Sequence, residues 1–378
     1  MEEPILRRTW AEIDLDALAH NYQQARRKIG PNVKYLGVVK ADAYGHGAIQ
    51  VSRKLEQLGA DYLAVSSLDE AKELRRAGIQ APILILGHTP PAMVSQLIQY
   101  RITQAVSALA KAEAYSAAAV ESGGTLKVHI KVDTGMSRLG FLVREGHFDT
   151  GVESIAAACA LPGLEAEGIF THFAVSDEDD RDSEAYTRAQ FDVFTRVLDA
   201  LAAGGRTFAI RHCANSGALA RYPEMYLDAV RLGSALLGRL SFPGEMGLTR
   251  LGWCRSQVEL IREIPKGHTV GYGAAWRAKR PTKIAVCGVG YYHGFGTEKG
   301  NDLFRFRDCL RGGLGYVKAF LKKKAFYGTV NGKQARVLGH IGMVQTILDV
   351  TDIPCQVGDE IRLEINPLLV KGMDVTFE

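Results

Sequence analysis

The chain has 378 residues, enough to bury a large hydrophobic core, and its length suggests two domains rather than one. Its formal net charge of +4 is small and dispersed, and no basic block is interleaved with aromatic residues, so the composition argues against nucleic-acid binding. No apolar run approaches the roughly 18 residues of a membrane-spanning helix, so no membrane contact is indicated.

The first expected elements lead to a buried strand that ends in a lysine. Residues 10–16 are predicted to form a strand and a turn, followed by a helix over about 16–28. The apolar run Tyr35–Val39 predicts a short buried strand, because β-branched and aromatic residues suit a packed, pleated surface. Lys40 stands at the carboxyl end of this strand, before a glycine-punctuated loop over 41–47.

A regular alternation of strands and helices continues to about residue 240. Further strands are expected near 62–66, 83–86, 103–106, 126–132, 164–171, 207–212 and 227–231. Helical patterns between them lie near 68–77, 91–99, 108–120, 149–160 and 182–203. Eight strands in βα units predict a (β/α)8 TIM barrel over residues 11–242. A doubly wound open sheet is the alternative, but no G-x-G-x-x-G follows the first strand.

The pattern changes past about residue 241, where strand-like runs separated by Gly and Pro replace long helical periodicity. These runs lie near 256–264, 283–289, 335–338, 345–350 and 360–365. They predict a C-terminal β-rich domain over 243–378, and residues 1–10 are expected to supply an N-terminal strand that packs on it. A basic stretch, 299–324, interrupts the pattern; we expect a solvated face, with an anion-attracting rim as the alternative.

The cysteines and the start of the chain indicate the compartment. Six cysteines lie far apart without a C-x-x-C pair, which argues against a disulfide framework and against a zinc site. The start, M-E-E-P-I-L-R-R-T-W, lacks the apolar segment of a secretory signal. We therefore expect a cytoplasmic protein, and we expect no metal.

Lys40 lies where barrel enzymes place their chemistry, at the carboxyl end of an inner strand. A lysine amine can condense with an aldehyde cofactor, and partial burial would lower its pKa; the alternative is an ordinary surface lysine. The segment V-V-K-A-D-A-Y-G-H-G, residues 38–47, closely resembles the lysine segment that binds pyridoxal 5′-phosphate (PLP) in the alanine racemase family. The resemblance extends from about Trp10 to the end of the chain. It implies that Lys40 bonds the cofactor and that Tyr44 contacts its phosphate.

A second segment, K-V-H-I-K-V-D-T-G-M-S-R-L-G at 127–140, carries two basic side chains around a glycine-bearing turn. A guanidinium there could hold a carboxylate or the cofactor's phenolate oxygen by charge-assisted hydrogen bonds. The segment resembles the family motif in which the lysine is carbamylated. The resemblance makes Lys131 the candidate modified lysine, and it implies that Arg138 reaches the cofactor and the substrate carboxylate. The alternative for Lys131 is an ordinary ion pair with Asp133 or with another neighbouring residue.

Two later strand ends carry groups suited to a phosphate. Asn215 and Ser216, in R-H-C-A-N-S-G, stand at an expected helix N-terminus, where free N–H groups favour an anion. Gly233 and Ser234, in V-R-L-G-S-A-L-L-G, let the backbone approach an anion closely. Both segments resemble the family's phosphate cradle, and the loops after the last two barrel strands are the usual phosphate site.

Arg231 is unusual for a residue facing the cofactor ring. Most PLP enzymes set a carboxylate against the pyridine nitrogen, whereas an arginine cannot accept a proton at neutral pH. V-R-L-G resembles the family sequence in which arginine faces this nitrogen and leaves it unprotonated. His172, in G-I-F-T-H-F-A, resembles the histidine that hydrogen-bonds this arginine. The alternatives are a pair between Arg231 and Asp228, and a purely structural His172.

The second domain is expected to supply groups on the substrate side. Tyr272 in V-G-Y-G resembles the family's second catalytic base, which comes from the partner subunit. Tyr291 in G-V-G-Y-Y-H-G resembles a residue that lines the substrate entrance. Met343 in G-H-I-G-M-V-Q resembles the residue whose backbone N–H meets the substrate carboxylate.

The departures from the family concentrate in this domain. His340 stands where the family usually has arginine, Val344 where it usually has aspartate, and Thr297 replaces an entrance arginine. The end of the chain lacks a clear counterpart to the tyrosine that normally touches the phosphate. These departures leave the side-chain preference open.

The resemblance implies a homodimeric, PLP-dependent racemase that interconverts L- and D-alanine with two bases, Lys40 and the partner's Tyr272. Two bases are needed because a single base tends to return the proton to the face it came from. A racemase that prefers serine, or one of broader specificity, is the main alternative. A decarboxylase of the same fold should carry an acidic residue in place of Arg231, and a single-domain PLP-binding protein would lack Tyr272. A cofactor-independent racemase would need two facing cysteines.

Overall fold

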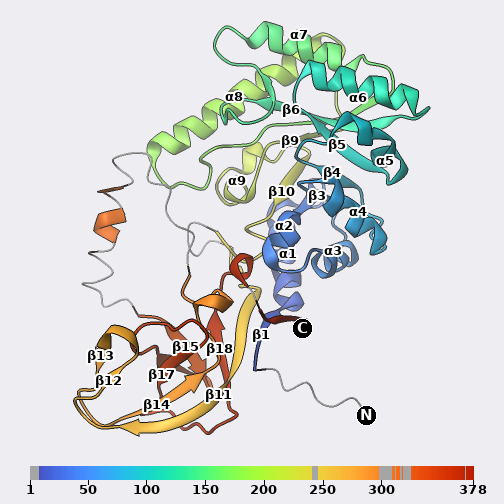
Figure 1. Cartoon of the computed structure of the whole chain (residues 1–378). Coiled ribbons are helices and arrows are strands. Elements are labelled where there is room, and N and C mark those ends of the chain that lie inside the picture. Colours follow the sequence, from blue (N-terminus) through green and yellow to red (C-terminus); the bar gives the residue numbers. More distant parts are fainter. Residues whose placement is uncertain are drawn as a thin grey trace. The chain divides into compact units, whose positions relative to one another are not determined.

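The structure, a computed structural model, describes residues 8–240, 246–297, 309–310, 312–315, 317, 325–370 and 372–378. The chain divides into two compact units. One consists of the chain up to Asp14 together with Gly252–Glu378, and the other consists of Leu15–Leu251 (Figure 1). The boundaries predicted from the sequence lie at residues 10 and 242.

The unit Leu15–Leu251 is a closed barrel of eight parallel strands, which confirms the predicted fold. The strands follow the order β5-β4-β3-β2-β10-β9-β8-β6, and a β5–β6 pairing closes the ring. A short strand, β7 (Phe141–Leu142), pairs with β6 outside the ring. The eight barrel strands are β2 (Lys34–Val38), β3 (Tyr62–Val65), β4 (Ile83–Ile85), β5 (Ile102–Val106), β6 (Leu126–Asp133), β8 (Leu164–Phe170), β9 (Ile210–His212) and β10 (Ala229–Leu232).

Helices between the strands form the outer layer of the barrel. Three of them begin at side-chain caps. Ser67 accepts a hydrogen bond from the N–H of Glu70 at α4 (Leu68–Arg76), Asp180 accepts one from the N–H of Ser183 at α8 (Arg181–Ala203), and Asn215 caps α9 (Ser216–Arg221). The helices are α1 (Leu15–Ile29), α2 (Lys40–Gly45), α3 (Ala48–Gln57), α4 (Leu68–Arg76), η1 (Pro91–Met93), α5 (Val94–Gln99), α6 (Leu109–Glu121), α7 (Phe148–Cys159), α8 (Arg181–Ala203), α9 (Ser216–Arg221) and η2 (Pro223–Met225).

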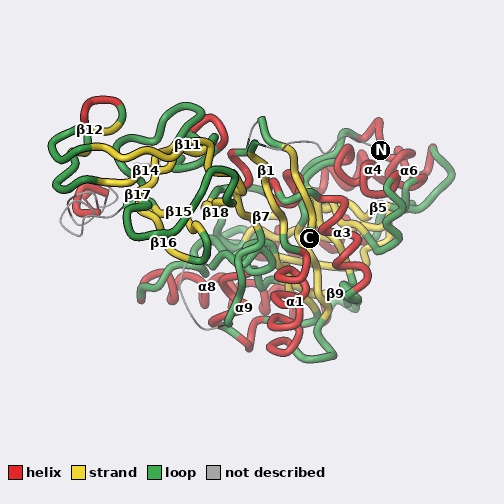
Figure 2. Tube along the Cα trace, turned by 90° about the horizontal axis from the view of Figure 1, so that it is seen from below, coloured by secondary structure: helices red, strands yellow, loops and turns green. Residues whose placement is uncertain are grey.

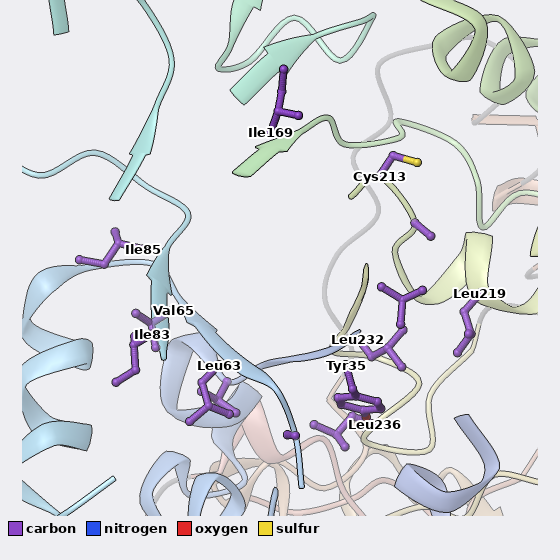
Figure 3. Packing of buried hydrophobic residues seen from close by; sticks show 14 of the residues in the cluster. Tyr35, Leu63, Val65, Ile83, Ile85, Ile169, Cys213, Leu219, Leu232 and Leu236 are labelled. Atoms are coloured by element: carbon purple, nitrogen blue, oxygen red, sulfur yellow. The ribbon is translucent and has the colours of Figure 1, made fainter. Parts of the chain in front are cut away.

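The strands divide their apolar side chains between two faces. On β3, Leu63 and Val65 belong to the large cluster that contains the helix side chains, whereas Tyr62 and Ala64 belong to a separate cluster. Figure 3 shows side chains of the larger cluster, including Leu63 and Val65, around the strands. Because successive side chains of a strand alternate between its faces, the smaller cluster lies inside the barrel. Its members are Leu36, Val38, Tyr62, Ala64, Leu84, Ile210 and Ala229.

The second unit is built on an eight-stranded sheet (Figure 2). β1 (Thr9–Ile13) pairs antiparallel with the long strand β11 (Gly252–Ile264) and parallel with the last strand, β19 (Asp374–Phe377). Residues 1–7 of the expected N-terminal strand lie outside the described residues. The other strands of the sheet are β14 (Thr282–Cys287), β15 (Tyr327–Val330), β16 (Lys333–Arg336), β17 (Thr346–Asp349) and β18 (Glu360–Glu364).

Shorter elements complete this unit. β12 (Thr269–Val270) and β13 (Trp276–Arg277) form a two-stranded ribbon around the 3-10 turn η3 (Tyr272–Ala274). Two further 3-10 turns are η4 (Tyr291–His293) and η5 (Pro367–Leu369). Most of the basic stretch 299–324 lies outside the described residues. Within the described part of the chain, no helix combines the length and the apolar character that a bilayer crossing requires.

Candidate active site

A cavity of about 450 Å³ is lined by residues at the carboxyl ends of the barrel strands and in the loops that follow them. This is the end of a barrel at which βα-loops form active sites. The structure brings to this cavity all ten residues that the sequence assigned to the barrel half of the site. They are Lys40, Tyr44, Lys131, Arg138, His172, Asn215, Ser216, Arg231, Gly233 and Ser234.

Lys40 follows the first barrel strand, and its side chain is partly buried at the cavity. Its ammonium nitrogen lies 6.0 Å from the centre of the Tyr44 ring. Burial lowers the pKa of Lys40, and the positive charge of Arg138 lowers it further, against a smaller opposing effect of Glu70. A lysine in this environment has a larger fraction of reactive neutral amine than a surface lysine.

The segment after Lys40 is a left-handed helical turn, whereas the sequence predicted a loop shaped by its glycines. Ala41–Tyr44 have φ between 49° and 57°, a region that costs a non-glycine residue roughly 1–2 kcal/mol. Two carboxylates hold the turn: Glu70 accepts the N–H of Ala41 at 2.7 Å, and Asp42 accepts the N–H of Ala48 at 2.7 Å. This backbone brings Tyr44 to the same cavity as Lys40.

Lys131 is buried, and no carboxylate of the described residues forms an ion pair with it. Its side chain points into the barrel, 5.6 Å from the Phe170 ring, and burial together with Arg138 and Arg231 lowers its pKa to about 8. Asp133 instead accepts the backbone N–H groups of Gly135 and Ser137, at 2.9 and 3.0 Å. The described residues show no ion pair between Lys131 and Asp133, so this alternative is wrong.

Arg231 is fully buried and held by acceptors at the ends of two neighbouring strands, β8 and β9. Nη1 donates to Nδ1 of His212 at 2.9 Å, and Nη2 donates to Nδ1 of His172 at 3.2 Å and to the Thr171 carbonyl at 2.8 Å. Asp228, the alternative partner from the sequence, pairs with Arg211 at 2.7 Å. Within the described contacts no acceptor engages Nε of Arg231, and the side chain lines the cavity.

Because arginine only donates, His172 must accept through a bare Nδ1, which places its ring proton on Nε2. Burial and the charge of Arg231 hold the pKa of His172 well below its ordinary value, so the ring is neutral at neutral pH. His212, which the sequence analysis did not assign, makes the shorter contact to Arg231. Its signal was a histidine at the last position of a buried strand.

The predicted phosphate cradle is assembled where the chain leaves β9 and β10. The Ser216 hydroxyl accepts the N–H groups of Gly233 and Ala235 at 3.2 and 3.1 Å, which joins the two strand ends. Glycine is required at 233, because a Cβ there would lie 2.6 Å from the Tyr44 hydroxyl. Asn215 caps the first turn of α9 through the N–H of Ala218 at 3.0 Å. Hydroxyls and backbone N–H groups therefore meet in one pocket that can receive an oxyanion.

The residues that the sequence assigned to the other half of the site lie in the second unit. Tyr272 is 81% exposed on η3, between Gly271 and Gly273, which both have positive φ. Tyr291, on η4, and Met343 are 48% and 57% exposed. Large side chains with this exposure are available to another surface.

Comparisons with known proteins agree along the whole chain. The family model "Alanine racemase, N-terminal domain" matches residues 13–241, and "Alanine racemase, C-terminal domain" matches residues 253–367. The alanine racemase of Desulforamulus reducens is 38% identical, over 100% of this chain and 93% of its own. That of Desulfosudis oleivorans is 39% identical, over 93% of this chain and 86% of its own.

Solved structures of alanine racemases also resemble this chain over nearly its whole length. The alanine racemase of Clostridium difficile 630 has a TM-score of 0.81 at 30% identity and covers 99% of this chain and 97% of its own. The alanine racemase of Bacillus anthracis, solved with bound L-Ala-P, has a TM-score of 0.75 at 29% identity, over 100% of this chain and 96% of its own.

Proposed function

Because this chain belongs to the alanine racemase family, we propose that it interconverts L- and D-alanine with PLP, using Lys40 and the partner subunit's Tyr272 as bases. It is an isomerase of the amino-acid racemase class. The observation that carries the proposal is the gathering of Lys40 and nine further predicted residues around one cation-rich cavity.

The residues of the cavity fit PLP. Lys40 offers an amine of lowered pKa, and the space in front of Gly233, which a Cβ would fill, adjoins the Tyr44 and Ser216 hydroxyls. Asn215, Ser216, Gly233, Ser234 and Tyr44 would hold the phosphate. When bound, PLP acidifies the Cα–H group of an amino acid attached to its aldehyde carbon.

Each remaining side chain of the cavity has a separate task. Arg138 binds the substrate carboxylate, which fixes the Cα–H bond relative to the bases. Arg231 would face the pyridine nitrogen as a hydrogen-bond donor and leave it unprotonated, and His172 accepts a hydrogen bond from the guanidinium. Lys40 takes or returns the Cα proton on one face, and Tyr272 does so on the other, so that the configuration inverts.

The proposal includes a two-fold homodimer. Tyr272, Tyr291 and Met343 are exposed in the single chain, which suits residues that complete the site of a partner. In this arrangement Tyr291 lines the substrate entrance, and the Met343 N–H meets the substrate carboxylate.

We also propose that Lys131 is carbamylated. A neutral Lys131 amine can add to CO2 with loss of a proton, which replaces a cation by an anion beside Arg138 and Arg231 and removes their repulsion. A cytoplasmic location is part of the proposal, and it suits six cysteines that form no disulfide within the described part of the chain.

The test is conversion of single amino acids by the purified protein with added PLP, followed by chiral chromatography. We expect D-alanine from L-alanine and the reverse, with a higher kcat/KM than for serine. A higher kcat/KM for L-serine would select the serine-preferring alternative, and release of CO2 and an amine would identify a decarboxylase. Absence of any D-amino acid from PLP-loaded protein would contradict the racemase proposal.

A further inference from the structure

A file of polar side chains crosses the inside of the barrel behind Arg231. His212 on β9, His129 on β6 and Glu167 on β8 point into the interior that elsewhere holds apolar side chains. Both histidine rings are completely buried, and His212 stacks on Phe170 with ring centres 4.8 Å apart. Buried polar groups are costly unless each one is satisfied, and among the described contacts Nε2 of His129 is the atom of this file that makes no hydrogen bond.

The hydrogen bonds of the file have one direction. Arg231 donates to Nδ1 of His212, so the proton of that neutral ring lies on Nε2. This Nε2 lies 2.8 Å from Nδ1 of His129 and must donate to it. The proton of His129 is then on Nε2, which lies 3.5 Å from Oε2 of Glu167 and faces no nearer acceptor among the described residues.

Both histidines are neutral, because burial lowers their pKa values. Glu167 opposes this effect at His129, and the charge of Arg231 adds to it at both rings. The file ends at a carboxylate. Glu167 also accepts the Tyr62 hydroxyl at 2.7 Å and the Lys127 ammonium at 3.0 Å, and its pKa is lowered to about 2, chiefly by the His129 ring.

A β-bulge places Glu167 in the file. In the pairing of β6 with β8, Val128 is opposite Ala166 and His129 is opposite Gly168, so Glu167 is the extra residue. A bulge can turn a side chain toward the opposite face of its strand. Gly168 makes room for the ring, because a Cβ there would lie 2.6 Å from Cε1 of His129.

We propose that Glu167 is a positioning residue that fixes the tautomers of His129 and His212, so that a bare ring nitrogen always faces Arg231 and aligns its guanidinium toward the cofactor. Without Glu167, the His129 and His212 protons can both move to the opposite nitrogens. His212 would then present an N–H to Arg231, and two donors would face each other. The proposal rests on the proposed function, in which Arg231 meets the pyridine nitrogen.

The test compares the affinity for PLP with that for 1-deaza-PLP, in which a C–H group replaces the pyridine nitrogen. Both are titrated at equilibrium against the Lys40→Ala protein, so that no covalent bond contributes. This protein should prefer PLP by about 10- to 100-fold, the usual value of a charge-assisted hydrogen bond. Adding Glu167→Met should reduce the preference to within about threefold, through weaker binding of PLP alone.

Matched variants separate positioning from general damage. Glu165→Gln changes a carboxylate of the same strand that is 53% exposed and 3.5 Å from Lys127, and it should keep the full preference. Glu167→Gln retains a hydrogen-bond acceptor and should keep most of the preference for PLP over 1-deaza-PLP. If Glu167→Met does not fold, His129→Leu interrupts the same file nearer to Arg231 and should have the same effect.

A second readout needs no cofactor. Long-range ¹H–¹⁵N spectra of protein labelled in its histidine rings should show His129 and His212 protonated on Nε2, and a changed tautomer of both in Glu167→Met. An unchanged PLP preference in Glu167→Met, or a different tautomer in the wild type, would overturn the inference. Binding of neither compound would instead contradict the proposed function, and the spectra would then decide the inference alone.

Discussion

The two units differ in how they present their predicted functional residues. In the barrel unit, ten such residues from five strand ends meet at one cavity, and several are buried cations such as Lys131 and Arg231. In the β-rich unit, Tyr272, Tyr291 and Met343 stand exposed on turns and loops. A barrel collects its strand ends at one edge, whereas a sheet with connecting turns spreads them. The barrel unit therefore gathers its candidate groups within one unit, whereas the exposed groups of the second unit are available to another surface.

The largest expected effect comes from removing the amine of the barrel half. Lys40→Ala should lower kcat for racemisation by about 10³-fold or more in both directions, since both cofactor attachment and one proton transfer depend on it. It should also lose the yellow colour of bound PLP. The measurement is chiral chromatography with an absorbance spectrum of the same sample. Retained colour and activity would show that Lys40 is an ordinary lysine at a strand end.

The second largest effect is expected from Tyr272, the exposed candidate base of the β-rich unit. Tyr272→Phe should lower racemisation by about 10²- to 10⁴-fold, because one face of Cα loses its base, while cofactor binding stays intact. In D2O, the variant should still exchange the Cα hydrogen of one enantiomer through Lys40, with retention of configuration. Proton NMR of both enantiomers measures this. Equal exchange of both enantiomers would exclude Tyr272 as the second base.

A smaller effect concerns the crowding of cations in the cavity. The pKa of Lys131 falls from 10.5 to about 8 on folding, so the unfolded chain binds more protons between these pH values. The free energy of unfolding should therefore rise with pH across this window, as the charged amine, unfavourable below pH 8, loses its proton. Lys131→Met should remove this rise and stabilise the cofactor-free protein at pH 7 by about 1–3 kcal/mol.

Urea unfolding at pH 7 and pH 10 measures how the free energy of unfolding of each protein depends on pH. The buffer must be free of CO2, because carbamylation of Lys131 would remove the cation. Equal pH dependence of the wild type and Lys131→Met would mean that Lys131 is not a destabilised cation. Readmission of CO2 should stabilise the wild type alone.

The sequence predicted the barrel better than the β-rich unit for a physical reason. Each barrel strand is a short apolar run between amphipathic helices, so its position is visible locally. The strands β12, β13, β15 and β19 were not predicted, since two- to four-residue strands are formed by their partners rather than by their own composition. The left-handed turn after Lys40 was also missed, because contacts from Glu70 and Asp42 fix it.

Prediction of the site residues has the same limit, because features fixed by distant contacts are not visible in the local sequence. Lys131, Arg138 and Arg231 could be predicted because their segments resemble known motifs. Glu167 could not, because alternation counted back from Ile169 puts it on the outer face, whereas alternation counted on from Ala166 puts it on the inner face. The bulge between Ala166 and Gly168 decides between the two. A bulge depends on the register of two strands, which no single segment of sequence reveals.

The central claim is that each active site joins Lys40 of one chain to the partner subunit's Tyr272. The most direct measurement mixes two inactive variants, Lys40→Ala and Tyr272→Phe, under conditions that exchange subunits. Half of the dimers should then be mixed, and each should contain one site with both bases, which restores about one quarter of the wild-type activity. If no activity returns although subunit exchange is demonstrated, the two bases belong to the same chain and the claim is wrong.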